Sequence, residues 1–212
     1  MSPRPRGYKA DRGALSYAKI EGIAARVRRV LAPDVPLSEA LPGLELFENL
    51  EAFGVRTPTG KISLSYGVLD LPAGVEAETR YFEDNNCIVV GLSATTYKHL
   101  ERGQGRARHT LNHEVGHAVL HAEQLKRMST LPHAAAALAR AQEHRFCEDT
   151  EWQADAFAAA LEMPARGLLA LESRYGNLSS SLVSSMMQVS VEAAVNRLNT
   201  FGTRRAALLN SN

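Results

Sequence analysis

Residues 108–121 read RHTLNHEVGHAVLH, and the five residues at 113–117 decide how the rest of the chain is interpreted. Two histidines four positions apart, His113 and His117, project from one face of an α-helix, about 40° apart around its axis, and can bind one metal ion. Glu114 follows the first histidine, where its carboxylate can reach a water on the metal rather than the metal itself, as a general base must. The stretch therefore predicts a catalytic zinc site on a buried helix.

A third ligand is expected in the stretch EWQADAFAAALEMP at residues 151–164. A catalytic zinc ion commonly takes three protein ligands and keeps its fourth position for water. Glu151 is the best candidate, because it stands in a helix predicted over residues 139–161. Asp155, one turn on along the same face, can accept the far N–H of a ligand histidine and so fix its tautomer. Two imidazoles and one carboxylate favour Zn2+, although Mn2+ or Fe2+ can occupy similar ligands.

Together the two stretches resemble the ImmA/IrrE family of metallopeptidases, and a looser likeness extends over most of the chain. The resemblance implies a zincin-like fold of the glutamate-ligand type (a minimal gluzincin). It implies His113, His117 and Glu151 as metal ligands and Glu114 as the base, with Asp155 where family members often have asparagine. It also implies a cytoplasmic enzyme, bacterial or phage-encoded, that cleaves helix-turn-helix transcriptional repressors and so switches on stress-response or mobile-element genes.

The sequence departs from the family pattern at two positions near the motif. His109 stands where phenylalanine is common, and Glu162 stands where an apolar residue is common. His109 and His121 also extend the histidine row by one turn in each direction. Rotation around the helix carries both away from a single metal point, so we interpret them as supporting or packing residues rather than extra ligands or proton shuttles.

The group that would stabilise the oxyanion is not identified by the sequence. His144 and Arg145 precede the third ligand by two turns, but surface charge is the more ordinary role for such residues. Tyr97 and Tyr175 compete for the same task. Cys147 is interpreted as a small buried residue rather than a ligand or a redox trigger.

Composition excludes little. A chain of 212 residues with 45% hydrophobic side chains can bury one sizeable core. The formal charge of +1 neither requires nor excludes a nucleic-acid partner. Two cysteines are too few for a disulfide scaffold and suit the reducing cytoplasm. No segment approaches the length of a membrane span.

Hydrophobic periodicity divides the chain into three parts. Residues 1–13, basic and without periodicity, predict a flexible tail. Residues 14–165 are expected to form the metallopeptidase domain, an α+β unit with a small sheet over the motif helix. Residues 166–212 are expected to form a helical segment packed on that domain. The elements expected within the domain are helices over 14–31 and 38–53, strands over 61–69, 78–83 and 87–92, and helices over 93–100, 106–124 and 139–161.

Residues 182–198 resemble a helix-turn-helix with its turn at 188–189. The second helix offers Glu192, Asn196 and Arg197 and little else that could bind phosphates, so direct DNA binding is not expected. A structural or substrate-docking role is preferred.

These observations lead to one hypothesis and two alternatives. The hypothesis is a zinc endopeptidase whose protein substrate, a helix-turn-helix repressor, follows from the resemblance alone. The alternatives are a metalloprotease toxin with a broader target range and a non-catalytic regulator that binds DNA or a repressor and holds zinc structurally. An intact Glu114 argues against the regulator, because a structural site has no use for a base beside an open position.

Overall fold

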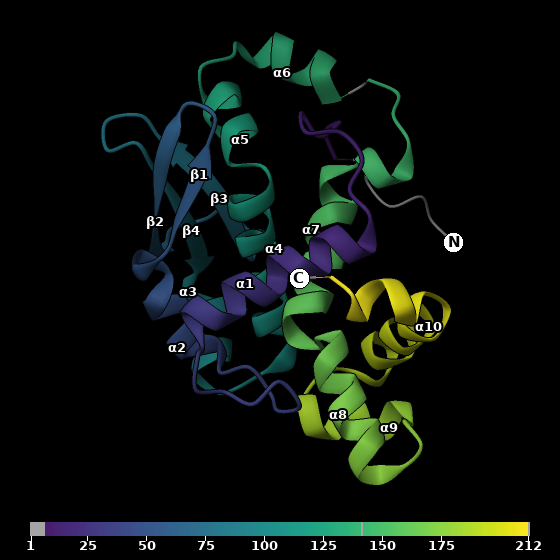
Figure 1. The fold of residues 1–212 in the computed structure, drawn as a ribbon. Helices are drawn as coiled ribbons and strands as arrows, with labels where there is room; N and C mark the ends of the chain where they lie inside the picture. The colour runs from purple at the N-terminus through teal and green to yellow at the C-terminus, as the bar shows by residue number, and fades with distance from the viewer. Residues whose placement is uncertain (1–6, 141, 212) are drawn as a thin grey trace.

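The structure is a computed structural model that describes residues 7–140 and 142–211. A four-stranded sheet lies at one side of the molecule, and α8–α10 lie at the other (Figure 1). Between them, α4 (Gly105–Leu120) packs on β3 and β4 of the sheet and on α7 (Thr150–Glu162). The arrangement confirms the predicted α+β class with a small sheet beside the motif helix.

The amino-terminal helix follows its apolar pattern. In α1 (Tyr17–Leu31) the side chain of Ser16 caps the helix by accepting the N–H of Lys19. The apolar stripe of α1 is buried and packs on α7. The second predicted helix, over residues 38–53, is shorter than expected. It begins after Pro42 as α2 (Gly43–Glu48) and continues as a 3-10 helix, η1 (Asn49–Ala52).

The sheet has the order β1-β2-β4-β3. Strands β2 and β4 are parallel, while β1 pairs with β2 and β3 pairs with β4 in antiparallel fashion. The predicted β3–β4 hairpin is confirmed, with Asn86 at φ 44° in its turn. The strand β1 was not expected. The bounds are β1 (Gly54–Thr57), β2 (Gly60–Leu69), β3 (Ala77–Phe82) and β4 (Cys87–Ser93).

Both long helices predicted after the sheet are interrupted. After α3 (Ala94–Glu101), the motif helix predicted over 106–124 ends at Leu120, and α5 (Ala122–Ser129) begins after a non-helical His121. The helix predicted over 139–161 is wrong over residues 142–149, which form no α-helix. A separate helix, α6 (His133–Arg140), precedes a short 3-10 turn, η2 (Phe146–Glu148), and α7 starts only at Thr150.

Residues 7–13 are docked, contrary to the flexible tail predicted over 1–13; residues 1–6 lie outside the described part of the chain. The backbone N–H of Gly7 donates to Asp149 Oδ2 over 3.0 Å, and that of Tyr8 donates to Thr150 Oγ1 over 3.0 Å. Asp11 forms a two-pronged ion pair with Arg127 on α5. The prediction failed because this segment is held by backbone and polar contacts, which leave no apolar periodicity in the sequence.

The carboxyl-terminal helices form a second apolar cluster, which begins at Met163. The helix-turn-helix-like pattern is present, with Gln188 in the left-handed region and Ser190 capping α10. Arg197 is buried, however, and donates to Met163 O over 2.8 Å and to Glu21 over 2.6 Å. It is therefore unavailable to a phosphate, although it was one of the three residues considered for DNA contact. The helices are α8 (Ala165–Tyr175), α9 (Ser180–Met187) and α10 (Val191–Leu209).

Among the described helices, none combines the length and the apolar character that a membrane span requires.

Candidate metal centre

The site is built on two helices that approach closely. The motif lies on α4 and the second stretch lies on α7. Gly116 makes the approach possible, since a Cβ at this position would stand 3.1 Å from the Cα of Ala154 and 3.2 Å from the ring of Phe157. At the start of α7, the carboxylate of Asp149 accepts the N–H groups of the first turn. Glu151 is thereby held in that turn, opposite the motif.

The structure brings His113, His117 and Glu151 together. The two Nε2 atoms of the histidines are 3.0 Å apart, and the Glu151 carboxylate lies 3.3 Å from His113 Nε2 and 3.5 Å from His117 Nε2. A tetrahedral zinc ion with bonds of about 2.0–2.2 Å separates its ligand atoms by about 3.3 Å. Among the described His, Cys, Asp and Glu side chains, these three cluster closely enough to hold a metal ion. The donor set therefore fits zinc in both spacing and chemistry.

The surroundings of the site favour positive charge. Asp155 Oδ1 lies 2.8 Å from His113 Nδ1, as the helical spacing predicted. Burial opposes the charged form of His113, but the Asp155 and Glu151 carboxylates outweigh it and raise the pKa of His113 to about 10. Burial likewise opposes ionisation of Glu151, yet the two histidines hold its pKa far below the usual range. A site that stabilises a cation this strongly suits a divalent metal ion.

Glu114 points toward the sheet side of the same site. Its Oε2 atom accepts a hydrogen bond from the hydroxyl of Thr79 on β3 over 2.6 Å. Its charge also acts on His113. The proposed base is therefore next to the three candidate ligands, and the edge strand of the sheet holds its carboxylate.

The two flanking histidines lie outside the ligand cluster, in agreement with the preferred interpretation. His109 Nδ1 lies 3.2 Å from Glu162, so the two departures from the family pattern contact one another. His121 lies behind the site, with its Nδ1 3.3 Å from His117 Nδ1. Burial, followed by the effect of His117, lowers the pKa of His121 to about 3.

The candidates for the oxyanion stabiliser have partners elsewhere. His144 bonds Asp149, the cap of α7, and Arg145 pairs with Glu148. Tyr97 packs near Phe47 in the main core, and Tyr175 stacks with Arg174 at the end of α8. None of these described contacts places the four side chains at the metal cluster.

Both cysteines are free thiols. Cys147 is half-buried beside Trp152, in a cavity of about 290 Å³, so it lies apart from the ligand cluster as preferred.

Two residues at the site were not anticipated. Thr79 is separated from Glu114 by 35 positions, and no local pattern marks it. Gln153 stands in the second stretch, between Glu151 and Asp155, but its side chain turns to the opposite side and bonds His121. The one signal available in the sequence was that a polar residue stands on an otherwise apolar helix face.

Comparisons with known proteins bear on the motif region. A model of the Peptidase_M78 family, described as the IrrE N-terminal-like domain, matches residues 99–199. No curated protein matches the sequence. A solved structure described as a Mycobacterium tuberculosis transcriptional regulator is similar at 15% identity and a TM-score of 0.40, over 86% of this chain and 51% of that one. The present chain thus spans about half the length of that protein.

The family match covers α4 and α7 with all five residues discussed as ligands, base and tautomer-fixing carboxylate. It agrees with the resemblance that those two stretches carry. Over residues 99–199, the chain is similar to the Peptidase_M78 family, the IrrE N-terminal-like domain.

Proposed function

We propose that this chain is a zinc-dependent endopeptidase in which His113, His117 and Glu151 hold the metal and Glu114 is the general base. The observation that carries the proposal is the convergence of three ligand atoms at zinc-like spacing with the Glu114 carboxylate, held by Thr79, beside them. When bound, the metal would polarise the scissile carbonyl and make water more acidic. Asp155 would hold the His113 ring with Nε2 directed at the metal.

Glu114 performs the proton transfers in this proposal. Its carboxylate takes a proton from the attacking water as the new C–O bond forms at the peptide carbonyl. It then passes that proton to the amine nitrogen as the C–N bond breaks, which returns Glu114 to its ionised form. Thr79 keeps the carboxylate in place between the two transfers.

The substrate would bind as an extended strand. β3 is the last strand in the order β1-β2-β4-β3, so one of its sides has no partner within the described sheet. Thr79 lies on this strand and contacts the base, which places the free edge beside the catalytic groups. A peptide that adds to this edge by backbone hydrogen bonds would pass the metal centre.

The proposed substrate is a helix-turn-helix transcriptional repressor in the cytoplasm, whose cleavage derepresses stress-response or mobile-element genes. Support for this step comes from the family likeness. Direct DNA binding is not part of the proposal, because Arg197, the cation within residues 191–198, is buried against Glu21.

The test is cleavage of the helix-turn-helix repressor encoded nearest this gene. Wild type and Glu114→Gln are each incubated with it, with added zinc or with a chelator. Cutting at one site by wild type alone, abolished by chelation, is the expected result. Binding of the repressor without cutting under any metal would reject the peptidase and favour a regulator that acts by contact, whereas cutting of many unrelated proteins would favour a toxin.

A further inference from the structure

A chain of three polar side chains, the half-buried His117 and the buried His121 and Gln153, runs inward from the metal centre. His117 Nδ1 lies 3.3 Å from His121 Nδ1, and His121 Nε2 lies 3.0 Å from Gln153 Oε1. The amide nitrogen of Gln153 is 2.9 Å from the carbonyl oxygen of Gly13 and 2.9 Å from that of Cys147. We call His117, His121 and Gln153 the ligand-support chain.

The far end of the ligand-support chain fixes the direction of every hydrogen bond in it. Two backbone carbonyls can only accept, so the Gln153 atom between them must be the amide nitrogen, with both of its hydrogens engaged. The amide oxygen therefore faces His121 and can only accept. It follows that His121 carries its hydrogen on Nε2.

This assignment passes on to the ligand histidine. His121 is 5% exposed, and its ring nitrogens contact an amide oxygen and another imidazole rather than a carboxylate, an arrangement that favours the neutral ring over a buried charge. A neutral ring with hydrogen on Nε2 has a lone pair on Nδ1, so His117 Nδ1 must donate to it. The hydrogen of His117 is thereby kept off Nε2, the atom that faces His113 and Glu151.

We infer that His121 and Gln153 are positioning residues that hold His117 in the tautomer able to bind the metal, with the docked residues 7–13 supplying one of the two final acceptors. The inference deepens the proposed function and rests on His117 being a ligand. His113 obtains the same tautomer from the Asp155 carboxylate. The two ligand histidines are thus oriented by different means, and the ligand-support chain achieves it without adding negative charge to the site.

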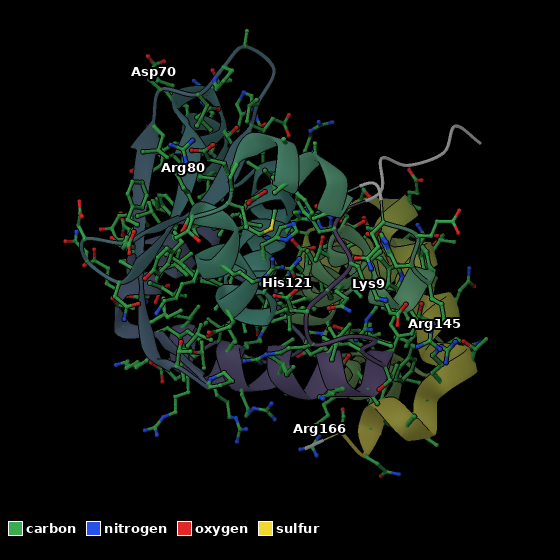
Figure 2. All side chains as sticks on the ribbon, turned by 90° about the horizontal axis from the view of Figure 1, so that it is seen from above. Lys9, Asp70, Arg80, His121, Arg145 and Arg166 are labelled. Carbon is green, nitrogen blue, oxygen red and sulfur yellow. The ribbon has the colours of Figure 1, made fainter. Side chains whose placement is uncertain are left out.

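The location of the chain agrees with this role. His121 is drawn near the middle of the molecule among the helices, whereas Arg145 and Arg166 lie toward its edge (Figure 2). His121 also stands between the end of α4 and the start of α5, where the backbone is not helical. Gln153 is fully buried. A buried polar chain is tolerated when each donor and acceptor in it is satisfied, as it is here.

The first measurement needs no variant. Long-range 1H–15N correlation spectra of the zinc-free wild-type chain at neutral pH report which nitrogen of each imidazole carries hydrogen. We expect His121 to carry it on Nε2 and His117 on Nδ1. Finding the His117 hydrogen on Nε2 in the folded, zinc-free protein would overturn the inference.

The second measurement is zinc affinity, determined by competition with a chromogenic chelator. His121→Phe keeps the ring and removes both nitrogens, and Gln153→Leu removes the amide at similar volume. Each is expected to weaken zinc binding by roughly 10–100-fold, the usual effect of losing a residue that orients a ligand. Unchanged affinity in both folded variants contradicts the inference.

Gln124→Leu is the matched control. Gln124 is another buried glutamine that bonds the amino-terminal segment, through Lys9 O and the N–H of Asp11, but it does not touch the ligand-support chain. It should bind zinc within a few-fold of wild type and keep the His117 tautomer. A loss equal to that of Gln153→Leu would mean that general destabilisation explains the effect. The tautomer and zinc-affinity measurements do not depend on peptide cleavage. If both give the expected results but the wild-type protein cuts no repressor, the proposed function is refuted and this inference stands.

Discussion

The hydroxyl of Thr79 donates a hydrogen bond to the carboxylate of Glu114 over 2.6 Å, joining the edge strand of the sheet to the proposed base. The same hydroxyl lies 3.0 Å from the Glu114 carbonyl, so it bridges side chain and backbone of one residue. Because a peptide on β3 would pass Thr79, this residue would contact both the bound substrate strand and the proposed base.

Thr79→Val should lower kcat about tenfold, equivalent to ~1.4 kcal/mol of transition-state stabilisation, with little change in KM. The reason is that valine keeps the shape of threonine but leaves the Glu114 carboxylate without its donor. Steady-state cleavage of the repressor measures both constants. Thr79→Ser retains the hydroxyl and should stay near wild type, and equal loss in both variants would show that packing rather than the hydrogen bond is responsible.

Arg197→Met should reduce the free energy of unfolding by about 3–5 kcal/mol, because it leaves the buried Glu21 carboxylate without a positive charge beside it. Denaturant titration followed by circular dichroism measures the loss. The control is Arg205→Met, which removes a solvent-screened pair with Glu172 and should cost far less than the loss of the buried pair. Similar losses in the two variants would contradict the structural role assigned to Arg197.

The sequence predicted the elements that have a regular apolar period. The helix over 14–31 and the β3–β4 hairpin are present with small shifts in their bounds. The four-residue spacing of the motif also places both histidines of the pair on one helix face. These features depend on local geometry, which a single sequence contains.

The features that were missed depend on contacts between distant segments. Alanine-rich sequence favours helix over 139–161, but Asp149 caps a helix that begins only at Thr150. Thr79 reaches the base through the placement of β3 against α4, and no residue pattern encodes that placement. Residues 7–13 dock through backbone hydrogen bonds, for which the sequence carries no periodic signal.

The His109–Glu162 pair should make stability depend on pH. The hydrogen bond to Glu162 raises the pKa of His109 above its ordinary value of about 6.5, against the opposing effect of burial. A raised pKa means that the folded state binds the proton more tightly than the unfolded state does. The contribution of protonated His109 to the free energy of unfolding is therefore complete below about pH 6.5 and is lost as pH rises through the folded pKa. Denaturant titrations of wild type over this range, compared with His109→Phe, measure it.

The double variant His109→Phe, Glu162→Leu is the control for that comparison. It replaces the pair with apolar residues, so the part of the pH dependence that belongs to His109 should disappear. A difference between wild type and His109→Phe that is constant across the range would contradict the assignment.

Gly7→Ala should release the amino-terminal segment from the start of α7. A Cβ at Gly7 would stand 2.5 Å from Thr150 Oγ1, 2.7 Å from Glu151 Cγ and 3.0 Å from the Glu151 backbone nitrogen. The last of these is backbone and cannot move aside, so the substitution should cost about 1–3 kcal/mol as overpacking. Hydrogen exchange should show faster exchange of the amides of residues 7–10, with the amides of α1 unchanged.

Gly202→Ala, in α10 with open space around its added Cβ, is the matched control and should be neutral or stabilising. Because the clash falls on Glu151 itself, Gly7→Ala should also weaken zinc binding, and unchanged affinity together with faster exchange would show that the metal ligand holds its position without the segment.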